Sequence, residues 1–251
     1  MHFLKENVYR AICIIIFILL WELVAYLYDS PFFPTPVEVF KSLLSLLKYG
    51  KNYNQILITM FRVLIAMPIA MLIGGIIGIL PQYFKPAKYF VESVIFPLFQ
   101  SIPPISWILL FSIWLGLSPI NPIIAASITA LPYVIIPISQ GIKELDKNLI
   151  ELGLSFTKKK VKILKKIVIP LLYPYFFTAL RSSFGFMWRI MVVVELFLAV
   201  NGIGYMAVIA REAYNVSRVL AWSICVSIIM TFFEYVVFNY IEKKTVKKEK
   251  E

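Results

Sequence analysis

Three charged residues lie in one long apolar segment, where a charge is costly without a partner. Arg181, Arg189 and Glu195 fall within a run that otherwise has the composition of a membrane-spanning helix. A charge at the centre of a bilayer costs about 2.5–3.5 kcal/mol on insertion scales, so each needs a partner or a water-filled cavity. On a helix Arg181 and Glu195 are about 21 Å apart, and Arg189 and Glu195 lie on different faces. Their partners must therefore come from other elements.

Two roles remain open for these arginines. In the first, Arg181 or Arg189 presents a guanidinium to an anion, for which its planar fork of donors is suited. In the second, the arginines pair with Glu195, Glu234 or Glu92 and so lock a dimer, or they extend to the membrane surface. We favour the second, structural role.

Composition excludes most other chemistry. The 251 residues are 60% hydrophobic and 16% charged, against about 25% charged in a soluble domain. His2 is the only histidine, and Cys13 and Cys225 both lie in apolar stretches. We therefore expect no catalytic residues, no metal site and no cofactor site. The net charge of +11 is better explained by cytoplasmic loops of a membrane protein than by nucleic-acid binding.

The apolar runs predict an all-α polytopic membrane protein with six transmembrane helices in a single domain, 1–251, whose core is 55–241. Prolines interrupt the third run at Pro97, Pro103 and Pro104. Broken helices at membrane depth are tolerated where they are buried in protein or line a cavity. Pro103 and Pro104 therefore mark either a pathway wall or a packed kink, and the sequence does not choose between them. The predicted spans are 11–28, 56–80, 89–115, 120–139, 167–200 and 220–241.

Two amphipathic segments lie between the spans. Residues 36–50 begin with a capping box at Thr35 and Glu38, and we expect a helix along the membrane surface that ends at Gly50. Residues 143–169 are rich in lysine and carry one apolar stripe that includes Leu149, Leu152 and Phe156. Asp146 or Asn148 can cap this short helix. Its stripe needs a cover, which the same subunit, the lipid surface or a soluble partner could supply.

Lysine and arginine are distributed unequally between alternate loops. With the N-terminus inside, the cytoplasmic segments hold 17 of these residues and the outer segments hold 5. This asymmetry is the positive-inside pattern. We therefore expect both termini in the cytoplasm and a location in the cytoplasmic (inner) membrane.

The order of several short motifs resembles the transmembrane subunit of type I ABC importers, in the nitrate, sulfonate and taurine group. In the cytoplasmic segment, Glu151-Leu152-Gly153 stands at the start of the family signature, and residues 167–170, which end at Pro170, stand at its end. Leu152 and Gly153 replace the usual two alanines, and Thr157 replaces a glycine that normally makes the turn. The other motifs are Phe33-Pro34-Thr35-Pro36, Ser101-Ile102-Pro103-Pro104, Trp114-Leu115-Gly116, Leu180-Arg181, Trp188-Arg189, Val194-Glu195 and Asn201-Gly202-Ile203-Gly204-Tyr205.

The resemblance implies a permease subunit that acts with partners. These are a second copy of the chain, a cytoplasmic ATP-binding cassette ATPase that binds the ATP, and an extracytoplasmic substrate-binding protein. The solute implied is small and anionic or polar, of the sulfonate, nitrate, taurine or vitamin-precursor class. The chain itself has no phosphate-binding loop of the form G-x-x-x-x-G-K-[ST], so we do not expect it to be an enzyme. The residues implied in ATPase coupling are Asp146, Leu149, Glu151, Leu152, Gly153, Thr157 and Pro170; those considered for the pathway are Pro103, Pro104, Arg181, Arg189 and Glu195.

One alternative remains in another class. An ion-coupled secondary transporter would need a carboxylate relay within the membrane and usually inverted repeats. We find no repeat, and Glu195 alone would make a poor relay.

Overall fold

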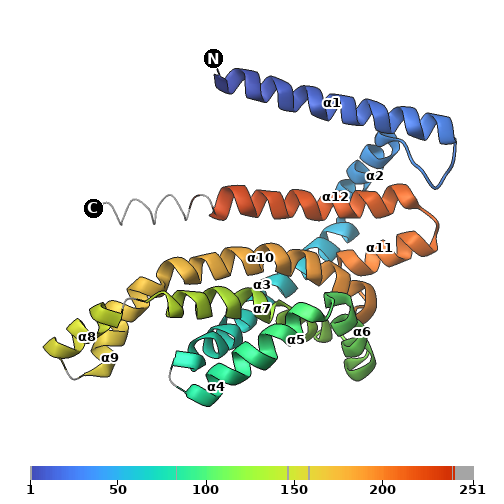
Figure 1. The fold of residues 1–251 in the computed structure, drawn as a ribbon. Helices are drawn as coiled ribbons and strands as arrows, with labels where there is room; N and C mark the ends of the chain where they lie inside the picture. The colour runs from blue at the N-terminus through green and yellow to red at the C-terminus, as the bar shows by residue number, and fades with distance from the viewer. Residues whose placement is uncertain (1, 83, 146, 158, 239, 241–251) are drawn as a thin grey trace.

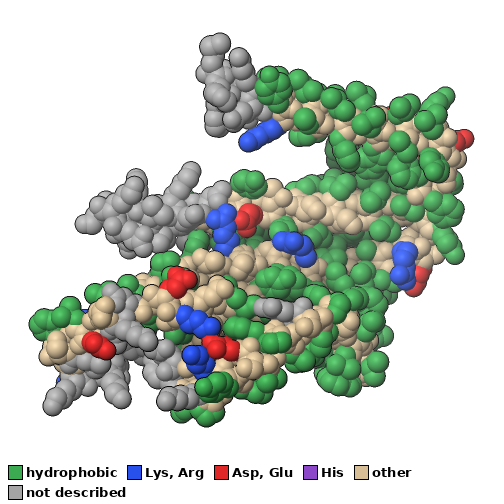
Figure 2. Space-filling view, viewed as in Figure 1, with side chains coloured by type: hydrophobic (Ala, Val, Ile, Leu, Met, Phe, Trp, Pro, Cys, Tyr) green, Lys and Arg blue, Asp and Glu red, His purple; other side chains and the backbone are tan. Residues whose placement is uncertain are grey.

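The computed structural model describes residues 2–82, 84–145, 147–157, 159–238 and 240, and every regular element among them is a helix (Figure 1). Hydrophobic side chains cover most of the face shown in Figure 2. Within these residues, five helical segments are long and apolar enough to cross a membrane. They are Val8–Tyr28, Gly50–Ile79, Asn121–Lys143, Lys165–Leu198 and Val216–Val236.

A further crossing is broken in the middle. Its arms, Pro86–Phe99 and Pro104–Leu115, meet at 93°. Ile102 is extended, as expected before a proline, and Pro104 occupies the first turn of the next helix. The interruption expected at Pro103 and Pro104 is therefore confirmed, and with this bent pair the spans number up to six. Pro97 differs, because it lies within the first arm directly after the π-helical turn Val91–Ile95, and the helix continues past it to Ser101.

The elements follow in the order given by Figure 1. The long helices are α1 (His2–Tyr28), α2 (Pro36–Lys48), α3 (Gly50–Ile79), α7 (Asn121–Lys143), α10 (Ile169–Leu198) and α12 (Val216–Phe232). The shorter helices are α4 (Lys85–Phe90), α5 (Phe96–Ser101), α6 (Pro104–Leu115), α8 (Lys147–Phe156), α9 (Lys160–Ile163) and α11 (Ile203–Glu212). Single π-helical turns occupy Val91–Ile95, Leu164–Val168 and Phe233–Phe238.

The core is formed by α3, α7 and α10. Gly74 and Gly78 of α3 face Val134 and Ile138 of α7, where an added Cβ atom would lie within about 3 Å of these side chains. Small residues four apart let two membrane helices approach closely. Large buried side chains of α10 fill the other side of this contact, among them Met187, Trp188 and Met191.

Helix α1 stands apart from this core (Figure 1). Only 6% of its most apolar window is buried within the chain. Its indole Trp21 Nε1 donates to the carbonyl of Pro34 at 3.0 Å, which ties α1 to the loop before α2.

Helix α2 has the predicted capping box. Thr35 Oγ1 accepts from the Glu38 amide, and the Glu38 carboxylate accepts from the Thr35 amide. Its buried face, Val39, Leu43 and Leu46, includes leucines that pack in one cluster with Trp222 of α12.

The predicted end of α2 is wrong by two residues. The helix ends at Lys48, and Gly50 begins α3, which starts earlier than expected. Asn52 explains this: its side-chain amide donates to the Leu46 carbonyl at 3.0 Å. The end of α2 is thus satisfied by a side chain, and no C-terminal glycine cap is needed.

Candidate functional site

A buried ion pair links two membrane-spanning helices. Arg62 Nη1 of α3 lies 2.7 Å from Glu195 Oε1 of α10, and both side chains are almost completely buried. Thr59, one turn before Arg62, donates its hydroxyl to the Glu195 carboxylate at 2.9–3.0 Å. The sequence expectation that Glu195 must find its partner on another helix is met by Arg62. The pair lets both charges exist at membrane depth.

The same network holds the turn that precedes α11. Arg62 donates to the Asn201 carbonyl at 2.8 Å and to its side-chain oxygen at 2.5 Å. The amide of Gly204 donates to Glu195 at 2.9 Å, and that of Ile203 donates to Thr59 at 2.9 Å. The Glu195 carboxylate therefore accepts from the open N-terminus of α11, where the helix dipole favours negative charge.

Glycine is required at two positions of this turn. Gly202 has φ +102°, a conformation that other L-residues rarely adopt, and an added Cβ would collide with the Glu195 carboxylate. A Cβ on Gly204 would collide with the carbonyl of Val192. The Asn-Gly-Ile-Gly motif thus brings the backbone of α11 directly against Glu195.

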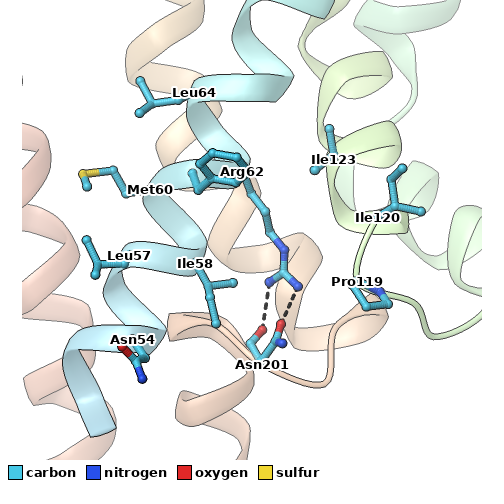
Figure 3. Close-up of a pocket in the computed structure, with 11 residues that line it drawn as sticks. Asn54, Leu57, Ile58, Met60, Arg62, Leu64, Pro119, Ile120, Ile123 and Asn201 are labelled. Carbon is cyan, nitrogen blue, oxygen red and sulfur yellow. Dashed lines mark hydrogen bonds between the residues drawn. The ribbon is translucent and has the colours of Figure 1, made fainter. Parts of the chain in front are cut away.

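A cavity of about 720 Å³ opens beside this network, between α3 and the segment that leads into α7 (Figure 3). Arg62 is the charged residue in its lining, but its terminal nitrogens bond to Asn201 and Glu195. Figure 3 shows the Arg62 guanidinium directed at Asn201, with Ile120 and Ile123 on the opposite wall. The remaining lining is mainly apolar, so this cavity is suited to apolar side chains or lipid rather than to an ion.

A second cavity lies at the broken crossing. It has a volume of about 560 Å³ and is lined by Pro103 and Pro104 together with residues of α7 and α10. Tyr133 stacks on Phe186 there, with ring centroids 3.9 Å apart. Hydroxyl groups and aromatic rings line this space, and none of the described residues that line it is charged.

A third groove, of about 460 Å³, lies between α10 and α12. It holds both arginines considered for the pathway. Arg181 Nε lies 2.8 Å from Glu234 Oε1, whereas Arg189 is exposed and donates to the Gly185 carbonyl at 3.0 Å. Ser182 lines this groove and also the second cavity. The structure therefore brings Pro103, Pro104 and the two arginines to adjoining spaces, and places Glu195 elsewhere.

Helix α8 presents an apolar stripe to the outside. Leu149, Leu152 and Phe156 are 42%, 56% and 83% exposed. Glu151 is exposed too, and Gly153 is buried against Ile163 and Ile167. A Cβ atom added at Gly153 would come too close to the terminal methyl group of Ile167, so this methyl group would have to move. The replacement of the family's alanine by glycine thus matches a bulky isoleucine opposite.

The remaining residues implied in ATPase coupling are Thr157, Pro170 and Asp146. Thr157 ends α8 without a positive φ, and its hydroxyl accepts from the Lys159 amide at 3.3 Å. The turn is therefore made through a side chain, where the family pattern uses a glycine. Pro170 lies in the first turn of α10. Asp146 lies outside the described residues.

Sequence reasoning missed two members of the buried network. Gln55 accepts from the Gly202 amide at 2.6 Å, and Thr59 bridges Glu195 to Ile203. Gln55, Thr59 and Arg62 are four and three residues apart, so they form one polar stripe on an otherwise apolar helix. That spacing is the sequence pattern from which the roles of Gln55 and Thr59 could have been predicted.

The fold and these sites define a polytopic helical membrane protein with a loop helix exposed outside its bundle. Residues 70–247 match the family model described as the inner membrane component of binding-protein-dependent transport systems. The chain belongs to this family. Its members are multi-pass permease components of ABC importers, which work with an ATPase and a substrate-binding protein.

Individual relatives agree with this assignment. A Methanocaldococcus jannaschii protein named as an ABC transporter permease is 28% identical over 96% of this chain and 91% of its own. The taurine transport system permease protein TauC of Escherichia coli is 25% identical, over 85% of this chain and 80% of its own. The nitrate import permease protein NrtB of Synechococcus elongatus is 26% identical, over 84% and 78%. The chain is a permease component of a binding-protein-dependent importer, and none of these relatives favours the ion-coupled alternative.

Proposed function

We propose that two copies of this chain form the membrane pathway of an ATP-driven importer for a small anionic solute. Sulfonates, taurine and nitrate are the classes suggested by the names of its relatives; a vitamin precursor remains a further candidate. ATP is bound and hydrolysed by a separate ATPase, and the chain itself catalyses no reaction.

The observation that carries the proposal is the exposed apolar stripe of α8. Leu149, Leu152 and Phe156 share one side of a two-to-three-turn helix that projects from the ends of α7 and α10 (Figure 1). Three large apolar side chains on a short helix favour a groove on a partner protein. We assign that groove to the ATPase, so that its nucleotide-driven movement is transmitted to α7 and α10.

The orientation follows from the position of α8. If α8 meets a cytoplasmic ATPase, the end of the bundle that holds Lys143 and Glu92 faces the cytoplasm. The chain then has both termini in the cytoplasm, in agreement with the distribution of its lysines and arginines. The turn held by Arg62 and Glu195 faces outward, where a binding protein delivers solute.

The pathway is assigned to the face that carries Pro103, Pro104, Arg181 and Arg189. Two cavities adjoin there, and their polar groups lie at membrane depth on the surface of the single chain. Such groups need water or protein around them. A second copy facing this surface would enclose both cavities, which supports a homodimer.

The proposal is tested by changing the stripe of α8. Leu149→Arg should abolish ATP-dependent uptake and co-purification of the ATPase while the permease is still inserted, because a charge cannot enter an apolar groove. Glu151→Arg, which reverses a charge beside the stripe, is expected to abolish uptake as well. Leu149→Met is the matched control, since it keeps a large apolar side chain at the same position, and it should retain uptake. Normal uptake and ATPase association in Leu149→Arg would disprove the role of α8.

A further inference from the structure

The guanidinium of Arg189 lies at the middle of the longest span. Its Nε donates to the carbonyl of Gly185, one turn nearer the helix N-terminus, and Gly185 is next to the midpoint of α10. Helical side chains lean toward the N-terminus, so Arg189 is directed away from the nearer end of its helix, Leu198. That end is nine residues away, about 13 Å. Arg189 therefore does not extend to the membrane surface.

The charge of Arg189 has no carboxylate partner among the residues that the structure describes. Glu234, the acidic residue in the same groove, is held by Arg181 at 2.8 Å. Glu195, six residues further along the helix, is held by Arg62. Glu92, the third carboxylate considered, pairs with Lys143. All three carboxylates are thus engaged elsewhere, which favours the anion-binding role over the structural one for Arg189.

Arg189 also supplies the free donors of this groove. The hydroxyl of Thr178 donates to the Pro174 carbonyl at 2.9 Å, and that of Ser182 is within 3.3 Å of the Tyr133 and Ala179 carbonyls. One nitrogen of Arg189 is used by Gly185, which leaves its terminal N–H groups for a ligand. A planar fork of N–H donors fits two oxygens of an oxyanion.

The groove is continuous with the cavity at the broken crossing. Ser182 lines both, and no charged residue lines the second cavity in the part of the chain that the structure describes. Figure 2 shows Lys, Arg, Asp and Glu side chains set into the otherwise hydrophobic surface formed by α10 and α12. Arg189 is therefore the cation available to an anion in this space, because it is not paired to a described carboxylate.

From these observations we infer that Arg189 is the anion-binding residue of the transport pathway and binds small oxyanions at the membrane midplane. This inference rests on the proposed function, because it takes this face of α10 as the pathway. Two other arrangements are possible for this groove. The phosphate of a lipid could bind Arg189 in place of a transported anion, or a second copy of the chain could pack on the groove and exclude water. The test separates these cases.

Site-directed labelling in the full transporter tests this directly. Cys13 and Cys225 are first replaced by serine and alanine, and Ser182→Cys is introduced into the complex with its ATPase, reconstituted in phosphatidylcholine nanodiscs. The thiol is labelled with anionic sulfonatoethyl methanethiosulfonate or with the cationic trimethylammonioethyl reagent. Ile228→Cys is the control for lipid exposure, since it is exposed on α12 and lies 200° around that helix from Met230 of the groove.

Three results are expected if the inference is correct. Ser182→Cys reacts with both reagents, and faster with the anion, whereas Ile228→Cys reacts with neither. Arg189→Gln lowers the preference for the anion about tenfold, the size expected of one charge at this range in a partly wet site. Nitrate or methanesulfonate at millimolar concentration slows the labelling of Ser182→Cys, and this protection is lost in Arg189→Gln. Arg211→Gln, which removes an exposed charge on α11, changes none of these rates.

Other results overturn it. Labelling as slow as at Ile228→Cys means that lipid seals the groove, and labelling lowered by phosphatidylglycerol but not by nitrate means that a lipid phosphate occupies Arg189. A disulfide between two copies of Ser182→Cys without reagent access means a dry interface. An unchanged charge preference in Arg189→Gln excludes the anion site. Uptake by the unsubstituted transporter is measured in a separate experiment. If it shows no ATP-dependent uptake of any oxyanion, the proposed function is wrong, whatever the labelling shows.

Discussion

Arg62 and Glu195 are 133 residues apart in the chain, yet their side chains meet at 2.7 Å in the interior of the bundle. The contact joins α3 to α10 and, through Asn201 and Gly204, also joins both helices to the turn before α11. A buried ion pair of this kind is costly to break, because one uncompensated charge is left inside. The pair and its hydrogen bonds therefore hold α3, α10 and the turn before α11 together at this end of the bundle.

Removing one partner of this pair should destabilise the protein strongly. We expect Glu195→Gln to lower the free energy of unfolding by about 3–5 kcal/mol, because Arg62 keeps its charge and loses its counterion. The change is measured as a fall in melting temperature in mild detergent. Glu92→Gln is the control: its pair with Lys143 is more exposed, and pairs of that kind contribute about 1 kcal/mol or less. Equal losses in both variants would contradict the assigned importance of the Arg62 pair.

The glycine before α11 should not tolerate a side chain. Gly202→Ala is expected to lower the melting temperature, since the backbone conformation of Gly202 (φ +102°, ψ 174°) costs about 1–3 kcal/mol for other residues and the new methyl group meets Glu195. Gly50→Ala provides the comparison, because nothing lies within 4 Å of its added Cβ and alanine favours the helix. We expect Gly50→Ala to be neutral or stabilising. A tolerated Gly202→Ala would show that the turn can adopt another conformation.

Packing of α8 should depend on Gly153. Gly153→Ala meets only the flexible end of Ile167 and should be accommodated, whereas Gly153→Val should overpack the contact at a cost of about 1–3 kcal/mol. The readout is limited trypsin digestion at the lysines between residues 159 and 166, which becomes faster as α8 separates from the helix that follows. Ser155→Val, on an exposed position of the same helix, controls for helix propensity. Equal digestion of Gly153→Val and Ser155→Val would refute the contact.

The capping box of α2 offers a fourth test. Thr35→Ala removes the acceptor for the Glu38 amide and should cost about 0.5–2 kcal/mol, while Thr35→Ser should retain most of the stability. Both are compared by thermal unfolding. A serine variant as unstable as the alanine variant would mean that the threonine methyl group, rather than its hydroxyl, is what matters.

Local patterns in the sequence predicted much of this fold. The spans, the capping box at Thr35 and the break at Pro103 depend on residues close in the chain, and each is seen in the structure. The end of α2 was misplaced because Asn52, from the next helix, satisfies the Leu46 carbonyl. A cap supplied by another element has no local signature.

The partners of the buried charges could not be predicted from the sequence either, because they also lie on other elements. Helical spacing showed that Glu195 could not pair on its own helix, but spacing does not say which distant helix lies opposite. The choice of Arg62 for Glu195 and of Glu234 for Arg181 depends on how α3, α10 and α12 pack. The roles of Arg189 and of the coupling residues in α8 stay predictions, which the experiments above address.

The packing of α2 on α12 has a consequence for how the protein is made. Leu43 and Leu46 are synthesised long before Trp222, against which they are finally buried. During translation the apolar face of α2 therefore has no contact with α12 until that helix has been made. Until then an amphipathic helix of this kind can bury its apolar face in the interfacial region of the bilayer. Completion of the N-terminal fifth of the protein thus depends on insertion of its last span, so a ribosome that stops before α12 releases a chain whose first helices are in the membrane but not yet folded together.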